Sequence, residues 1–174
     1  MQELTSVTFV YAMQEDRILA AINAGRPEAW SCWLTRRVVL AVLERVAEIL
    51  STTSTLAQRA PVELRRELAA FEHDAAMAQT AERMSPVPAD LLNTGATAAE
   101  LMEQLSITPQ GDNFRVELRG LRGGGAAGIL RRVGLQRILQ MLQDEVAKAG
   151  WLTTPSKSQS TQAVAEPTSK QFRQ

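Results

Sequence analysis

The chain has 174 residues, of which 45% are hydrophobic and 22% are charged, and these proportions are typical of a globular protein with one domain. Its 19 Lys and Arg residues balance its 19 Asp and Glu residues, which argues against a protein whose whole surface binds nucleic acid or an anionic membrane. The single cysteine, Cys32, excludes an intramolecular disulfide and therefore a disulfide-stabilised secreted scaffold.

No apolar run in the sequence approaches the roughly 20 residues that span a bilayer. The first residues also lack the basic segment and apolar core of a signal peptide. The sequence therefore predicts a cytoplasmic protein of bacterial type, without a membrane partner.

The first part of the chain predicts strands. Residues 5–13 are rich in β-branched and aromatic side chains, which favour a strand. Residues 17–23 and 29–34 flank a turn that contains Gly25 and Pro27, and this pattern predicts a hairpin.

Two helices are predicted next. Thr35 is a suitable N-cap for a helix over 36–51, whose apolar residues recur at helical spacing. Pro61 fits the first turn of a second helix over 61–83. Its narrow, Ala-rich apolar stripe predicts close packing or a peripheral position, and consists of Leu64, Leu68, Phe71, Ala75 and Ala78. Residues 89–98 are interpreted as an irregular connection with at most one helical turn.

Residues 100–108 fit either a strand or a helix. We favour a strand, because the turn over 109–113 then joins it to residues 114–119 in a hairpin. In that second arm Phe114, Val116 and Leu118 alternate with charged residues, as in a half-buried strand.

The run 120–128 is rich in glycine and is predicted to be irregular. A last helix is predicted over 129–149, with Gly150 as its C-terminal cap. After Leu152 the sequence becomes polar and poor in apolar residues, which predicts one domain over 1–152 and a disordered tail over 153–174.

Two segments of the sequence resemble each other, namely 37–47 and 137–147. Each is amphipathic and follows a strand-like run with a glycine-centred turn, and we align the turn at Gly25 with the turn at Gly111. The predicted fold is α+β, with an antiparallel sheet of about five strands, amphipathic helices packed on it, and two pseudo-repeated hairpin–helix halves. Chance similarity between two amphipathic helices is the alternative.

The glycine run matches the pattern G-x-G-x-x-G at Gly123, Gly125 and Gly128. Such a loop can present backbone amides to a phosphate, but the strand before it predicts a hairpin and no acidic residue ends a second strand downstream. A flexible connection is therefore the favoured interpretation. The anion-binding candidates in and around this run, together with two arginines of the first half, are Arg36, Arg37, Arg115, Arg119, Arg122, Gly123, Gly124, Gly125, Arg131 and Arg132.

Three tryptophans are candidate interface residues. Trp30 and Trp33 lie on opposite faces of a predicted strand, so one of them needs cover from a helix or a partner, and Trp151 follows the last helix. Cys32 is interpreted as a buried structural thiol, and His73 as a surface histidine without a second metal ligand at helical spacing. We predict no catalytic residues, no metal site and no cofactor.

These features favour a non-catalytic accessory or adaptor subunit that binds another protein in a bacterial cytoplasmic assembly, with a second copy of the chain as one candidate partner. The first alternative is a regulator that binds an anion or nucleic acid through the arginine-rich glycine loop, although nucleic acid is not favoured. The second alternative is a small enzyme that acts on a phosphate-bearing ligand.

Overall fold

The computed structural model describes residues 1–54, 58–80 and 87–152. The strands are β1 (Gln2–Glu3), β2 (Val7–Ala12), β3 (Arg17–Ile22), β4 (Trp30–Thr35), β5 (Glu100–Gln110), β6 (Asn113–Gly120) and β7 (Gly125–Arg131). The helices are α1 (Arg36–Thr53), the short 3₁₀ helix η1 (Val62–Leu64), α3 (Arg65–Thr80), α4 (Ala89–Ala98) and α5 (Arg132–Lys148). The predicted tail over 153–174 lies outside the described residues.

The fold is α+β, as predicted, but the sheet is larger and is mixed rather than antiparallel. It has seven strands in the order β1-β7-β6-β5-β4-β3-β2. The β4–β5 pair is parallel, with Cys32 opposite Glu100 and Trp33 opposite Leu101, and β1 is parallel to β7. Because β4 and β5 are parallel, a long connection, which includes α1, η1, α3 and α4, brings the chain back to the start of β5.

The chain repeats one unit of three antiparallel strands followed by a helix, β2-β3-β4-α1 and β5-β6-β7-α5. In the second turn of each unit a glycine has positive φ, +79° at Gly25 and +88° at Gly123. Gly25 therefore corresponds to Gly123 and not to Gly111, which lies in the turn between β5 and β6. The predicted alignment was wrong because it placed the glycine run between a strand and a helix. In the structure this run forms the turn between β6 and β7 and the start of β7.

Strand β7 occupies part of the run that the sequence predicts to be irregular, and it takes the first residues of the predicted last helix. Its glycines allow close approach of neighbouring chain segments. A Cβ at Gly125 would lie 2.5 Å from the Leu118 carbonyl oxygen, and one at Gly128 would lie 2.8 Å from the Leu4 carbonyl oxygen. Pairing of β7 with β6 on one side and with the N-terminal segment on the other thus overrides the low strand propensity of glycine.

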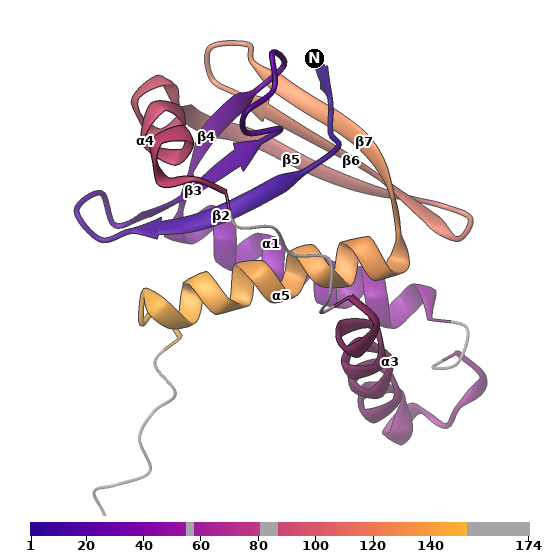
Figure 1. The fold of residues 1–174 in the computed structure, drawn as a ribbon. Helices are drawn as coiled ribbons and strands as arrows, with labels where there is room; N and C mark the ends of the chain where they lie inside the picture. The colour runs from indigo at the N-terminus through magenta and orange to yellow at the C-terminus, as the bar shows by residue number, and fades with distance from the viewer. Residues whose placement is uncertain (55–57, 81–86, 153–174) are drawn as a thin grey trace, which may run out of the picture.

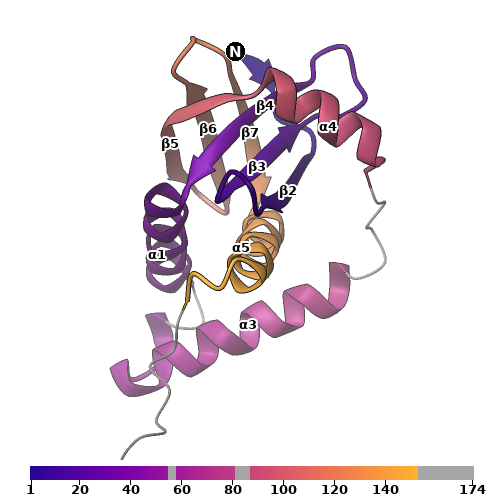
Figure 2. The ribbon, with the colours of Figure 1, turned by 90° about the vertical axis from the view of Figure 1, so that its left-hand side faces the viewer.

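The elements form layers on both sides of the sheet (Figure 1, Figure 2). Helices α1 and α5 lie side by side on one face, and α3 crosses them on the side away from the sheet. Helix α4 covers β3 and β4 on the opposite face. The prediction of an irregular connection at 89–98 was therefore wrong, since this segment is a ten-residue helix that packs on the sheet.

The core lies between the curved sheet and the pair α1 and α5. Phe114, Ile18, Leu34, Val39 and Leu135 are among its fully buried side chains. The alternation predicted for the strand over 114–119 is confirmed, because the apolar residues of β6 face this core while its charged residues do not. The preferred strand at 100–108 is also confirmed, as β5.

The N-terminal segment almost closes the sheet, since only three residues separate β1 at one edge from β2 at the other. Asn23 secures this connection with a fully buried side chain. Its Oδ1 accepts hydrogen bonds from the backbone amides of Thr5 and Ser6 at 3.1 Å, and its Nδ2 donates to the Glu3 carbonyl oxygen at 2.6 Å.

The predicted cap at the start of α1 and the predicted glycine after α5 are both present in the structure. The Thr35 hydroxyl accepts a hydrogen bond from the Val38 amide at 3.5 Å, which confirms the predicted N-cap of α1. Gly150 has φ +65° just after α5, as expected of a C-terminal glycine. Helix α3 ends at Thr80, and residues 81–83 of the predicted second helix lie outside the described residues.

Candidate functional site

The last residue of β6 and the loop that joins it to β7, residues 120–124, close over the carboxylate of Glu100. Glu100 is the first residue of β5 and is only 7% exposed. Its Oε1 accepts a hydrogen bond from Trp30 Nε1 at 2.8 Å, and its Oε2 accepts one from the backbone amide of Arg122. The backbone of Gly124 also hydrogen-bonds to this carboxylate.

Glycine is required where the loop meets Glu100. A Cβ at Gly120 or at Gly124 would overlap the Glu100 carboxyl group, and one at Gly124 would also overlap Trp30. Gly123 has open space around it, but its φ of +88° favours glycine. The glycine run therefore fits the chain around an internal carboxylate.

Glu100 is held in its charged form. Its burial raises the pKa, but the hydrogen bond from Trp30, the amide of Arg122, the Arg122 charge and the Gly124 backbone together hold the pKa below its usual value. Arg122 also donates from its guanidinium to the Ala98 carbonyl oxygen at 2.8 Å, which ties the loop to the end of α4.

The loop that the sequence analysis considered as a candidate site for an external anion thus binds Glu100. A carboxylate, like the phosphate that such a loop can bind, offers negatively charged oxygen atoms to amide donors. The chain therefore supplies an anion of its own to this loop. Sequence reasoning missed Glu100, because it lies 22 residues before Arg122 and 70 residues after Trp30.

Cys32 lies in the same part of the structure, opposite Glu100 in the β4–β5 register. It is fully buried, as predicted. Burial and the neighbouring Glu100 charge raise the pKa of the Cys32 thiol to about 12. The thiol therefore stays protonated at neutral pH, which does not suit a nucleophile.

The arginine candidates do not gather at the glycine loop. Arg115 and Arg119 lie on the solvent face of β6, and Glu117 between them forms ion pairs with both, at 2.6 and 3.9 Å. Arg131, at the end of β7, and Arg37, at the start of α1, are exposed on other elements.

Two further arginine candidates bind parts of their own chain. Arg36 donates to the Trp151 carbonyl oxygen at 3.0 Å. Arg132 donates to the Leu50 carbonyl oxygen at 3.0 Å and to the Thr53 hydroxyl at 2.6 Å, so it holds the end of α1.

The three tryptophans have different surroundings. Trp30 packs against the core and Trp33 lies on the other face of β4, partly buried, in agreement with the predicted alternation. Trp151 is buried, donates from Nε1 to Asp16 at 3.0 Å, and meets Tyr11 edge-to-face at 5.7 Å between ring centroids. It fastens the end of α5 to the turn between β2 and β3.

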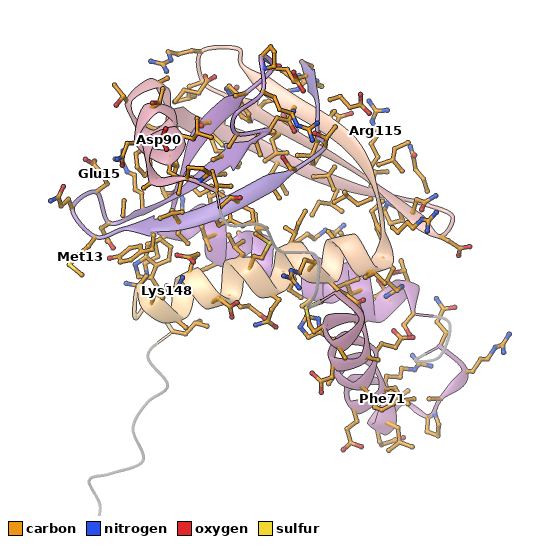
Figure 3. The ribbon with its side chains drawn as sticks, in the orientation of Figure 1. Met13, Glu15, Phe71, Asp90, Arg115 and Lys148 are labelled. Carbon is orange, nitrogen blue, oxygen red and sulfur yellow. The ribbon has the colours of Figure 1, made fainter. Side chains whose placement is uncertain are left out.

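Helix α3 offers a different kind of surface, because several apolar residues of its predicted stripe are exposed; Phe71 is labelled in Figure 3. Phe71 is 68% exposed and Leu64, in the preceding turn, is 46% exposed. Ala78 is also exposed, and Leu68 and Ala75 are partly buried. The stripe that sequence periodicity identifies is therefore directed away from the protein body, and the peripheral position of this helix is confirmed.

The opposite side of α3 binds the body mainly through polar side chains. Glu72 accepts a hydrogen bond from the Ser54 hydroxyl at 3.0 Å and lies 3.9 Å from the Arg132 guanidinium. His73 Nε2 lies 2.9 Å from Gln140 Oε1, and Ala76 is buried between these contacts. These interactions fix the rotation of α3 and leave Leu64, Phe71 and Ala78 exposed.

The interior of the sheet contains an apolar cavity of about 30 Å³, lined by side chains from both halves, including Phe9, Leu34 and Leu118. Ligand pockets usually have volumes of about 300 Å³ or more, so this cavity is too small for such a ligand as it stands.

Within residues 1–54, 58–80 and 87–152, no three His, Cys, Asp or Glu side chains are grouped so that they could hold a metal ion. In the same part of the chain, no helix is both long and apolar enough to cross a membrane. Comparison with protein-family models, with curated proteins and with solved structures found no match.

Proposed function

We propose that the protein is a non-catalytic accessory or adaptor protein that acts through protein–protein contacts in a cytoplasmic assembly. The observation that carries this proposal is the apolar stripe formed by Leu64, in the turn before α3, and by Leu68, Phe71, Ala75 and Ala78 of α3. Leu64, Phe71 and Ala78 are exposed, and Leu68 and Ala75 are partly buried. A helix normally turns its apolar side toward the core, because burial of a Phe or Leu side chain contributes about 1.5–3 kcal/mol. An apolar stripe on the outside is typical of a surface that another protein covers.

The polar attachment of α3 supports the same proposal. If the stripe were exposed only because α3 is loosely attached, no specific contact would fix the rotation of α3 about its axis. Instead, Glu72 and His73 contact α5 and Ser54, the residue after α1, and their positions on α3 force Phe71 to the outside. The helix therefore presents a defined apolar surface.

The glycine loop supports the two alternative functions less well than α3 supports the adaptor proposal. These alternatives are an anion-binding regulator and an enzyme that acts on a phosphate-bearing ligand. Glu100 already uses the amide of Arg122 and the backbone of Gly124. An external anion would have to displace this buried carboxylate or bind against the repulsion of its negative charge.

Site-specific photo-cross-linking in the organism that makes the protein tests the proposal. A photoreactive phenylalanine analogue replaces Phe71 in one full-length variant and Met13, which is 82% exposed in the turn between β2 and β3, in a control variant. We expect a discrete protein adduct from position 71 and none from position 13. The absence of a protein adduct at position 71, or the same adducts from both positions, would contradict the proposal.

A further inference from the structure

The charges beside the apolar stripe of α3 indicate what kind of partner covers it. Glu67 and Asp74 are exposed and lie seven residues apart, so they share one flank of the helix. Each lies three residues after an apolar residue of the stripe, Leu64 and Phe71 respectively, and therefore borders it. Glu63, which precedes the helix, is also exposed.

No described side chain neutralises this acidic flank. Arg65 is exposed and donates to the Ala60 carbonyl oxygen at 3.2 Å, whereas Arg132 pairs with Glu72 on the inner side of the helix. Within the part of the chain that the structure describes, neither Glu67 nor Asp74 takes part in an ion pair. A partner that covers the stripe has to approach these carboxylates.

A second copy of the same helix does not fit this charge pattern. In an antiparallel pair of α3 helices centred on Phe71, Glu67 of one copy would lie beside Asp74 of the other, and the twofold symmetry would repeat that contact. Like charges at such flanking positions destabilise a helix pair. The stripe therefore favours a different chain.

We propose that the apolar stripe of α3 binds an amphipathic helix of another protein, whose apolar side is bordered by Lys or Arg residues. This inference rests on the proposed function and specifies the chemistry of its partner. The apolar residues of the stripe provide the contact area, and Glu67 and Asp74 select a basic flank over an acidic one.

Two synthetic helical peptides of equal length test this inference on the full-length protein. Both carry the same leucine stripe, and the residues that border it are Lys in one peptide and Glu in the other. Affinity is measured by fluorescence anisotropy at low and at high salt. We expect the Lys peptide to bind about fivefold to tenfold more tightly at low salt, and this preference to diminish as salt screens the charges.

A charge-reversed variant tests whether Glu67 and Asp74 cause the preference for the Lys peptide. The double substitution Glu67→Lys and Asp74→Lys is expected to reverse the preference, so that the Glu peptide binds more tightly. The matched control, Glu15→Lys and Glu103→Lys, makes the same change in net charge at exposed positions on other elements and should leave the preference for the Lys peptide unchanged. The substitution Phe71→Ser should weaken the binding of both peptides.

Several results would overturn the inference. Equal affinity for the two peptides, no binding of either peptide, or an unchanged preference in the Glu67→Lys and Asp74→Lys variant would each do so. A concentration-dependent dimer that Phe71→Ser dissociates would identify a second copy as the occupant. If position 71 still cross-links to a partner in any of these cases, the proposed function stands and only the partner chemistry fails.

Discussion

The loop at residues 120–124 turns its hydrogen-bonding groups inward, whereas helix α3 turns its apolar side chains outward. The loop has donors of the kind that bind anions, and these donors bind Glu100. The helix has apolar residues of the kind that build cores, and Phe71 among them is 68% exposed.

The comparison teaches that residue type alone does not identify a binding surface. Polar donors that are already paired inside the chain stabilise the fold. They are poor binding sites, because an external ligand gains little by replacing an existing partner. Apolar residues that remain exposed are available for a partner. The loop should therefore be closed to external ligands and the helix surface open to a partner, and substitutions in the two regions should have different effects.

The largest effect is expected at Cys32, in the closed region. With a pKa of about 12, only about one thiol in ten thousand is ionised at pH 8, against roughly a quarter for an exposed cysteine. Alkylation by iodoacetamide at pH 8, followed by mass spectrometry, should therefore be about a thousandfold slower in the folded protein than in urea. A folded-state rate within tenfold of the urea rate would show that this region opens readily.

The next effect is expected at the contact between the loop and Glu100. Gly124→Val introduces a side chain where even a Cβ overlaps Glu100 and Trp30, and we expect the free energy of unfolding to fall by about 2–4 kcal/mol. Urea denaturation measures this change. Gly134→Ala in α5 is the control, because its Cβ has ordinary contacts and should stabilise the helix by about 0.5–1 kcal/mol. Similar stabilities for Gly124→Val and the original chain would mean that the loop does not close on Glu100.

A smaller effect is expected from Glu100→Gln. The amide nitrogen of the new side chain would face hydrogen-bond donors, so we expect the free energy of unfolding at pH 7 to fall by about 1–3 kcal/mol. Urea denaturation of this variant should be compared with that of Glu44→Gln, an exposed position on α1 that should change little. Equal changes in the two variants would contradict a specific role for the Glu100 carboxylate.

The same variant has a distinct pH dependence. Because the folded protein lowers the pKa of Glu100, this carboxylate stabilises the fold above its unfolded pKa, which is about 4.3, and that contribution is lost as the pH falls through the lower folded pKa. Stability measured from pH 7 down to pH 3 should therefore converge for the original chain and Glu100→Gln. A difference that stays constant over this range would argue that the charge of Glu100 is not responsible.

Local patterns in the sequence were sufficient for elements whose structure depends on near neighbours. The alternation of Phe114, Val116 and Leu118 predicted β6 and its buried face, and Thr35 predicted the start of α1. The sequence could not reveal β7, because Gly125 and Gly128 disfavour a strand until β6 and Leu4 pack against them. This is also why five strands were expected and seven are present.

The two surfaces were beyond sequence reasoning for a related reason. The environment of Glu100 combines the side chain of Trp30, the start of β5 and a distant loop, so no short segment carries its pattern. For α3 the periodicity identified the apolar stripe but not its direction. The direction is set by contacts of Glu72 and His73 with Ser54, Arg132 and Gln140.

The smallest effect on stability is expected at Phe71, and this separates the open surface from the core. Phe71→Ser should change the free energy of unfolding by no more than about 0.5 kcal/mol, because the side chain is already largely exposed. Phe114→Ala, at a phenylalanine that is 1% exposed, should lower it by about 3–5 kcal/mol. Urea denaturation of the two variants measures both changes. If Phe71→Ser destabilised the chain as much as Phe114→Ala, the stripe would be part of the fold rather than a surface for a partner. If it is neutral, any loss of partner binding in this variant reflects the missing contact and not an unfolded protein.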